Sequence, residues 1–227
     1  SDYGAASLQD SHLWKYGVPP SGNANYAWLQ MVVHKLSPSG VAGIVLANGS
    51  MTSNSGGENE IRKNMILDGV VDCMVALPTQ LFFNTQIPAC LWFLARNRTN
   101  GKFRNRKNEI LFIDVRKIGS LVTRKNRAFT EEDIQGIASV YHQWRSKTGE
   151  YHDQQGFCKS ATLEEVAANN FVLTPGRYVG TEDVEDDGVS FEEKVAGISE
   201  KLRTHFAESI ELQERIRLNL QKVGIEL

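Results

Sequence analysis

The chain has 227 residues, of which 41% are hydrophobic and 23% are charged. This balance excludes a disordered chain. A membrane helix needs roughly 18 consecutive apolar residues, and because no apolar run approaches that length, we do not expect a membrane protein. The formal net charge of −2, taken alone, argues against nucleic-acid binding. This value is an average over an uneven distribution of charges, so it does not exclude a local basic surface. A chain of this length can bury one sizeable core, or a core and a smaller helical appendage.

The cysteine and histidine residues indicate no metal chemistry. Cys73, Cys90 and Cys158 are odd in number and lack metal-ligand spacing, and two of them lie in apolar runs, so we expect buried free thiols. The five histidines have no carboxylate or cysteine at ligand spacing. We therefore predict no metal site, and the free thiols favour a cytoplasmic protein.

Hydrophobic spacing and turn residues predict alternating helices and strands. A helix over 23–36 has apolar residues at three- and four-residue spacing and stops at Pro38. The next strand, 41–47, is continuously apolar or small, as a strand covered on both faces would be, and it opens into Asn-Gly-Ser-Met at 48–51. In open α/β sheets, ligands bind beyond such strand ends. The further predicted elements are a helix over 58–67, strands over 70–77, 89–95 and 110–115, and helices over 131–144 and 191–221.

Two of these strands are expected to pair with each other. The loop PTQLFFNTQIP, residues 78–88, joins the strand 70–77 to the strand 89–95. This loop is too short for a crossover helix, so the two strands should form an antiparallel hairpin, at the edge of the sheet.

Several sequence motifs follow one another along the chain. They are WKYGVPP at 14–20, GNANYAWLQ at 22–30, AGIVLANGSM at 42–51, ALPTQLFFNTQIPACLWFLAR at 76–96, LFIDVRKIG at 111–119 and LTPGRYVG at 173–180. In this order they resemble the methyltransferase subunit of type I DNA restriction-modification systems, in the family of adenine-N6 DNA methyltransferases. The resemblance implies an α/β fold: residues 1–128 as the C-terminal half of a Rossmann-like methyltransferase sheet ending in an antiparallel hairpin, and residues 129–227 as a mainly helical region for subunit and DNA contacts.

Two motifs of that family do not occur in these residues. They are the Asn-Pro-Pro-Phe turn and the glycine-rich loop for S-adenosylmethionine; the pair Pro19-Pro20 lacks the preceding Asn. The resemblance therefore implies a C-terminal fragment with no catalytic residue and no bound cofactor, inactive alone, from a subunit that transfers methyl from S-adenosylmethionine to a flipped adenine. The alternative is a non-catalytic assembly or binding module that docks to the specificity subunit and DNA. A strand edge left unpaired by deletion invites self-association.

The loop between the paired strands is the candidate for target recognition. It carries two adjacent aromatic residues, Phe82 and Phe83. A methylase must rotate its target adenine out of the duplex, and an aromatic face stacks on such a base with roughly 1 to 3 kcal/mol. The resemblance implies an aromatic with this role here, and the spacing to Pro88 favours Phe82. The alternative is that the rings plug the core beneath the loop, which we expect of one of them.

A basic run extends from Arg96 to Arg127, with eleven positive and two negative residues. Its simplest interpretation is a solvated face or loop. Placed directly after a strand that should border a DNA cleft, the run becomes a candidate for phosphate contacts, which give affinity without reading sequence. The residues assigned to DNA binding are Arg96, Arg98, Lys102, Arg104, Arg106 and Lys107.

The helix predicted over 191–221 carries a narrow apolar stripe at three- and four-residue spacing. Such a stripe either packs on the helix's own domain or forms a helical arm for a partner. The resemblance favours the arm, because the family's methyltransferase subunit joins helices of a specificity subunit. The restriction subunit and double-stranded DNA are the other partners that the resemblance implies.

Overall fold

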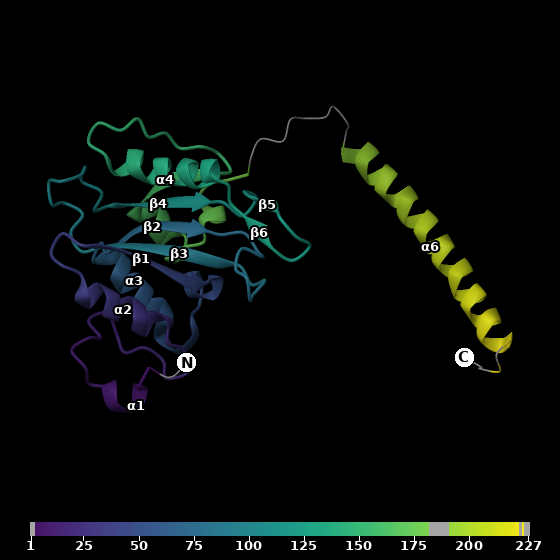
Figure 1. The fold of residues 1–227 in the computed structure, drawn as a ribbon, viewed down its shortest axis with the longest axis horizontal. Coiled ribbons are helices and arrows are strands. Elements are labelled where there is room, and N and C mark those ends of the chain that lie inside the picture. Colours follow the sequence, from purple (N-terminus) through teal and green to yellow (C-terminus); the bar gives the residue numbers. More distant parts are fainter. Residues whose placement is uncertain (1–2, 182–190, 223, 225–227) are drawn as a thin grey trace. The chain divides into compact units, whose positions relative to one another are not determined.

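The structure, a computed structural model, describes residues 3–181, 191–222 and 224 (Figure 1). The chain divides into two compact units, Ser1–Glu182 and Asp183–Leu227. The first unit contains a five-stranded sheet with helices on both faces, which confirms the α/β class. Helix α6 (Phe191–Lys222) forms most of what is described of the second unit. Throughout the described residues, each helix is too short or too polar to cross a membrane.

The sheet and its helices are built from short segments. The strands are β1 (Val41–Ala47), β2 (Val71–Ala76), β3 (Ala89–Ala95), β4 (Glu109–Asp114), β5 (Ser120–Leu121), β6 (Arg127–Ala128) and β7 (Cys158–Thr162). The other α-helices are α1 (Ala5–Leu8), α2 (Asn25–Lys35), α3 (Glu58–Leu67), α4 (Glu131–Arg145) and α5 (Leu163–Ala168). Every helix and strand that the sequence predicts is therefore present, with ends within two residues of the predicted ones.

Strand direction gives the sheet two different ends. The strand order is β1-β3-β2-β4-β7; β2 pairs in parallel with β4, whereas β3 pairs antiparallel with both β1 and β2. Strands β1, β2 and β4 consequently finish together, at Ala47, Ala76 and Asp114, and we call this the carboxyl end of the sheet. Strand β3 finishes at the opposite, amino end, where the Arg96 N–H donates to the Gly40 carbonyl (3.0 Å).

The predicted antiparallel pairing of β2 with β3 is confirmed, but this pair does not form the edge of the sheet. Strand β3 lies between β2 and β1, so the edge strand on this side of the sheet is β1, and β7 is the edge strand on the other side. Residues of β1 alternate between exposed and half-buried, with Val41 42% and Val45 48% exposed. The expectation that both faces of this strand are covered is therefore wrong within the described residues, because one face of β1 has no helix over it there.

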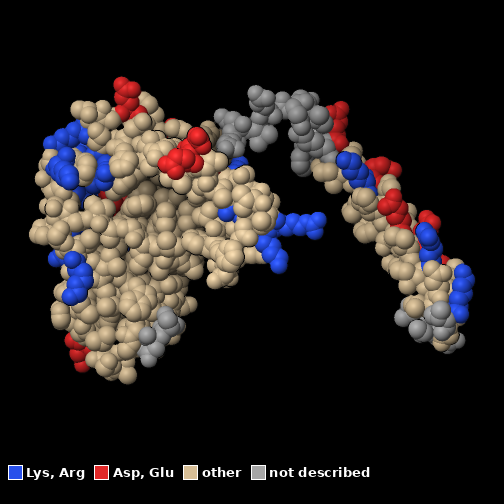
Figure 2. All heavy atoms as spheres, in the orientation of Figure 1, with Lys and Arg blue, Asp and Glu red and all other residues tan. Residues whose placement is uncertain are grey.

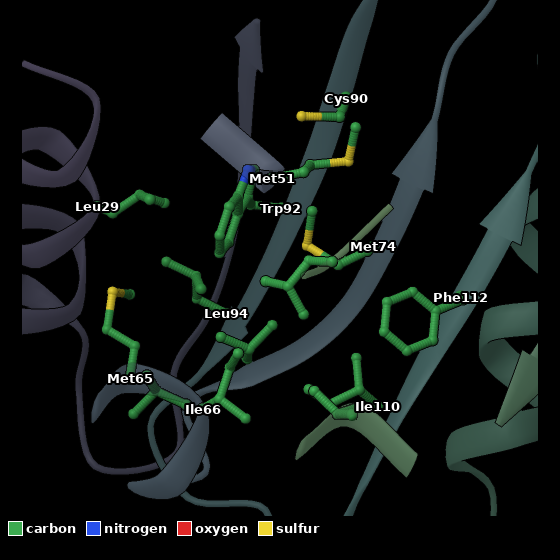
Figure 3. Close-up of a cluster of buried hydrophobic side chains, with 14 of the residues drawn as sticks. Leu29, Met51, Met65, Ile66, Met74, Cys90, Trp92, Leu94, Ile110 and Phe112 are labelled. Atoms are coloured by element: carbon green, nitrogen blue, oxygen red, sulfur yellow. The ribbon is translucent and has the colours of Figure 1, made fainter. Parts of the chain in front are cut away.

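Apolar side chains cover both faces of the central strands. On one face, Leu29 of α2 and Met65 of α3 pack with Trp92 and Phe112 of the sheet (Figure 3). On the other face α4 packs through Trp144. Full burial of one such side chain is worth about 1.5–3 kcal/mol, so these two layers supply much of the stability of the unit. The cysteines are free and buried, as expected: Cys73, Cys90 and Cys158.

Much of the chain after residue 128 belongs to the first unit. Strand β7 pairs with β4, and α4 covers one face of the same sheet. The expected domain boundary at residue 128 is therefore wrong, because the sheet is complete only with β7 and the units divide between Glu182 and Asp183. The sequence of β7, CKSAT, is too polar to predict a strand.

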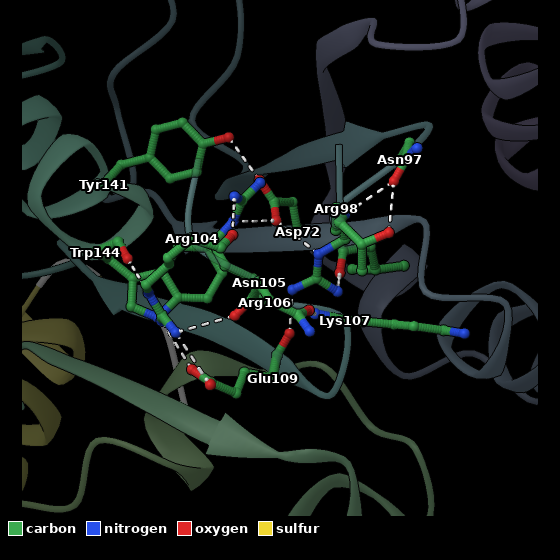
Figure 4. Close-up of polar contacts among 12 residues, drawn as sticks. Asp72, Asn97, Arg98, Arg104, Asn105, Arg106, Lys107, Glu109, Tyr141 and Trp144 are labelled. Atoms are coloured by element: carbon green, nitrogen blue, oxygen red, sulfur yellow. Dashed lines mark hydrogen bonds and ion pairs between the residues drawn. The ribbon is translucent and has the colours of Figure 1, made fainter. Parts of the chain in front are cut away.

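A buried carboxylate, Asp72 of β2, holds the amino end together (Figure 4). Its Oδ1 lies 2.7 Å from Arg98 Nε and 3.2 Å from Arg106 Nε, and its Oδ2 accepts a hydrogen bond from the Tyr141 hydroxyl (2.7 Å). Burial, reinforced by the Asp72 carboxylate, raises the pKa of Tyr141 above its ordinary value, so the phenol stays neutral and donates. One carboxylate thus joins β2, the loop after β3 and helix α4.

We predict that Asp72→Asn destabilises the first unit by about 3–5 kcal/mol, because removing one partner of a buried ion pair leaves uncompensated buried charge. The measurement is the free energy of urea unfolding followed by tryptophan fluorescence, since all four tryptophans lie in this unit. Glu60→Gln is the matched control: its 3.7 Å pair with Lys63 is exposed, so the expected loss is below about 1 kcal/mol. Equal losses in the two variants would contradict the role given to Asp72.

Candidate nucleic-acid interface

Four segments meet at the carboxyl end of the sheet, where ligands bind in open α/β folds. The 3-10 turns Asn48–Met51 and Ser55–Gly57 follow β1, and the loop 77–88 joins β2 to β3. Residues 114–119 lead from β4 to the β5–β6 hairpin, and the turn Pro175–Arg177 lies against the ends of β2 and β4. Strand direction brings the first three of these segments together, and packing of the chain after α5 adds the fourth, although all are widely separated in sequence.

The two aromatic residues of the loop 77–88 have different environments. Phe82 is half-buried and packs against the core beneath α4, and it pairs with Thr85 in an isolated bridge. This bridge places Phe83 in the turn, where its side chain is 91% exposed. One ring therefore packs on the core, as expected, and it is that of Phe82, the residue that the spacing favoured for stacking; the exposed ring is that of Phe83.

The β5–β6 hairpin is fastened to this loop. The Arg127 N–H donates to the Gln80 carbonyl (2.8 Å), and Gln80 Nε2 donates to the Arg124 carbonyl (3.3 Å). Gln80 adopts a φ of +64°, a left-handed conformation that is uncommon for residues other than glycine. The hairpin and the aromatic loop therefore form one surface.

The LTPGRYVG motif closes the carboxyl end from another side. The Leu173 N–H donates to the Met51 carbonyl (3.0 Å), and the Tyr178 ring stacks on Phe112 with 3.8 Å between the ring centres. Gly176 lies close to Arg116, because a Cβ added there would lie 2.6 Å from Nη2 of that side chain, which would have to shift. The motif is thus a packing element, as its lack of catalytic residue types indicates.

A buried arginine positions the loop after β1. Arg62 of α3 is fully buried and donates to the Ser53 carbonyl (2.6 Å) and to the Phe171 carbonyl (2.8 Å). One turn earlier, Glu58 is equally buried and accepts a hydrogen bond from the Ser53 hydroxyl. Sequence reasoning missed this cluster. The spacing could have revealed it, because Glu58 and Arg62 lie on the same face of the helix as Ile61 and other apolar residues.

The six basic residues assigned to DNA binding lie in the segment after β3, so they are at the amino end of the sheet, opposite Phe83. For Arg98 and Arg106 the assignment is wrong, because both side chains are at most 3% exposed and are paired with Asp72. The others differ in availability: Arg104 is half-buried and pairs with Glu109, Arg96 donates to the Val33 carbonyl, and Lys102 and Lys107 are exposed.

The basic run is therefore divided between the two ends of the sheet. Basic side chains also project from the β5–β6 hairpin at the carboxyl end (Figure 2). There Arg124 and Lys125 are exposed, whereas Arg127 points inward and donates to the Ile118 carbonyl (3.3 Å). Position in the sequence alone could not separate these two groups, because β4 carries the chain from the amino end to the carboxyl end of the sheet between them.

The described residues contain few side chains that could hold a metal or a cofactor. Within them, no group of three His, Cys, Asp or Glu side chains could hold a metal ion. The ribose hydroxyls of S-adenosylmethionine could be held by a carboxylate near a strand end, as in dinucleotide-binding sheets. Asp114, the last residue of β4, forms an ion pair with Arg116 (2.6 Å), so its carboxylate is engaged within the chain.

The chain is similar in sequence to methylase subunits of type I restriction enzymes. It is 54% identical over 220 residues to the Type I restriction enzyme HindI methylase subunit of Haemophilus influenzae, covering 97% of this chain and 48% of that protein. It is 38% identical over 213 residues to the MjaIX methylase subunit of Methanocaldococcus jannaschii, covering 92% of this chain and 37% of that protein. The chain thus spans about half or less of the length of these relatives.

The fold is similar to that of a solved methyltransferase subunit. The crystal structure of the type I restriction-modification system methyltransferase subunit from Streptococcus thermophilus matches 79% of this chain and 36% of that chain, with a TM-score of 0.68 and 28% identity. The family model described as N-6 DNA Methylase matches residues 1–187. The chain therefore belongs to the N-6 DNA Methylase family.

Proposed function

We propose that this chain is part of a site-specific DNA adenine-N6 methyltransferase subunit of a type I restriction-modification complex in the cytoplasm. The intact subunit would transfer methyl from S-adenosylmethionine to an adenine flipped from the duplex. Family membership supports the reaction class. The observation that carries the proposal for these residues is Phe83, a large aromatic side chain that is 91% exposed at the end of the sheet where ligands bind.

The reaction makes a particular demand on the base pocket. An adenine amino nitrogen is a poor nucleophile, because its lone pair is delocalised into the ring, so catalysis depends chiefly on holding that nitrogen in line with the methyl donor. An exposed ring suits this task, because stacking fixes the plane of the base without using its hydrogen-bonding edge. We assign this role to Phe83 and assign the support of its loop to Phe82, whose ring is held in the core.

We further propose that the chain is inactive alone. The hydrogen-bond partners of the adenine amine and the residues that grip the cofactor would come from the part of the subunit outside this chain. Two observations support this proposal: the Asp114 carboxylate is paired with Arg116, and the sequence has no glycine-rich loop. The chain would supply one wall of the base pocket, part of the DNA-binding surface and contacts to other subunits.

Helix α6 supports a role in assembly. Apolar side chains project from it into solvent, including Ile198 (66% exposed), Leu202 (51%) and Ile216 (55%). At 100° per residue these three lie on one side of the helix, as in the seam of a bundle. We propose that α6 packs against helices of the specificity subunit, in a complex that also contains the restriction subunit.

The alternative function is a non-catalytic module that only docks to the specificity subunit and DNA. The exposed stripe of α6 favours this alternative as much as it favours the enzyme, since both need the docking helix. The free side of β1 would permit self-association of the isolated chain in either case. What separates the two functions is the role of Phe83, because a docking module needs no ring for a flipped base.

The first prediction from the proposed function concerns the cofactor. Titration of this chain with S-adenosylmethionine in a calorimeter should give no binding heat at micromolar concentrations, because the cofactor residues are proposed to lie outside the chain. The intact subunit, titrated in the same buffer, is the control and should bind. A micromolar site on this chain would contradict the proposal that the cofactor residues lie outside it.

The second prediction concerns base stacking. Phe83→Ala in the intact, assembled subunit should lower the rate of DNA methylation about 5- to 150-fold, which corresponds to the loss of roughly 1 to 3 kcal/mol of stacking. Phe83→Tyr should retain most of the rate. Ile87→Ala is the matched control, because Ile87 is 66% exposed in the same loop but cannot stack. A Phe83→Ala enzyme as fast as this control would remove the base-stacking role from Phe83.

The third prediction concerns assembly. Replacing Leu202 and Ile216 together by Gln should weaken binding of the intact subunit to its specificity subunit by at least about tenfold, because two apolar side chains leave the interface. The control is Glu200→Gln with Glu211→Gln, since these residues lie on the opposite side of α6. Calorimetric titration measures both affinities, and an equal effect in the two pairs would exclude the stripe as the docking surface.

A further inference from the structure

The tip of the β5–β6 hairpin is ordered by hydrogen bonds within the turn. The Val122 N–H donates to the Asn126 carbonyl (2.9 Å), and the Thr123 hydroxyl accepts from the Asn126 N–H (3.0 Å) and from the Lys125 N–H (3.2 Å). None of these bonds uses the side chain of Arg124 or Lys125. The turn therefore presents two adjacent cationic side chains while its shape depends on other atoms.

The base of the hairpin is anchored on both sides. Ile118 and Phe129 flank it and pack against the core beneath α4. The Gln80 side chain bonds to the carbonyl of Arg124, so the loop that carries Phe83 and the hairpin tip are joined directly. An element fixed in this way keeps its charges at a constant place relative to the exposed ring.

The charge at the tip is not neutralised within the described residues. Both Arg124 and Lys125 are exposed, and neither takes part in an ion pair with another described residue. Two exposed apolar side chains precede them, Leu121 (55%) and Val122 (62%). By contrast, most cations at the amino end are engaged: Arg98 and Arg106 by Asp72, and Arg104 by Glu109.

We infer that the tip of the β5–β6 hairpin is a duplex-binding element, in which Arg124 and Lys125 contact backbone phosphates beside the base that stacks on Phe83. This inference rests on the proposed function. Unpaired cations next to an exposed aromatic ring suit a polyanion whose base is displaced, and phosphate contacts fix the register of the duplex without reading its sequence. The exposed Leu121 and Val122 suit the apolar sugar edges between phosphates.

The test measures the salt dependence of DNA affinity for the intact subunit assembled with its specificity subunit, on two unrelated duplexes of equal length. Arg124→Gln with Lys125→Gln should weaken binding to both duplexes alike and make the slope of log affinity against log salt shallower by about 1.8, at about 0.9 for each lost contact. Lys102→Gln with Lys107→Gln is the matched control: it removes the same charge from exposed residues at the opposite end of the sheet and should leave the slope unchanged.

The outcomes show whether the hairpin contacts DNA phosphates. An unchanged slope in the hairpin variant overturns it, and so does an equal change in both variants, because then the total charge matters rather than its place. A thermal unfolding midpoint equal to that of the parent checks that the hairpin variant folds, and the single substitution Lys125→Gln, with an expected slope change of about 0.9, serves if the double variant does not. Failure of the parent complex to bind either duplex would instead overturn the proposed function, and the hairpin inference with it.

Discussion

The arrangement of this protein depends on the neutralisation of two buried guanidinium groups by one buried carboxylate. Asp72 pairs with Arg98 and Arg106, and it also accepts the Tyr141 hydroxyl of α4. A buried charge without such a partner is costly, so this cluster fixes the loop after β3 and the helix α4 to the start of β2. Much of the positive charge that would suit nucleic acid is thereby used to hold the amino end of the sheet together.

Strand direction then determines which side chains lie together at the end of the sheet where ligands bind. Because β3 runs antiparallel to its two neighbours, the chain leaves the loop of Phe83 at one end of the sheet and enters the basic segment at the other. The chain returns to the first end only after β4, where the hairpin with Arg124 and Lys125 bonds to Gln80. An exposed ring and unpaired cations thus meet at the carboxyl end, and the packing of Arg62 and of the LTPGRYVG motif holds the loop after β1 beside them.

The sequence predicted the helices and strands better than it predicted which of them pack or pair with one another. Periodic apolar residues identified α2, α3, β2 and β3 because each buries one or both faces, whereas the polar β7 and the two-residue strands of the hairpin carry no such signal. Charge type could not reveal that Arg98 and Arg106 are buried, since their partner Asp72 lies in a different strand. The choice between Phe82 and Phe83 likewise depended on a bridge to Thr85, which fixes the turn and has no counterpart in composition or spacing.

We propose that duplex DNA lies against the carboxyl end of the sheet and not against its amino end. Hydrogen–deuterium exchange of the assembled complex, with and without duplex DNA, tests it most directly because the two ends are separate segments of backbone. We expect slower exchange with DNA in residues 79–87 and 118–127, and unchanged exchange in residues 97–107. Protection confined to residues 97–107 would contradict it and would place the duplex at the opposite end of the sheet.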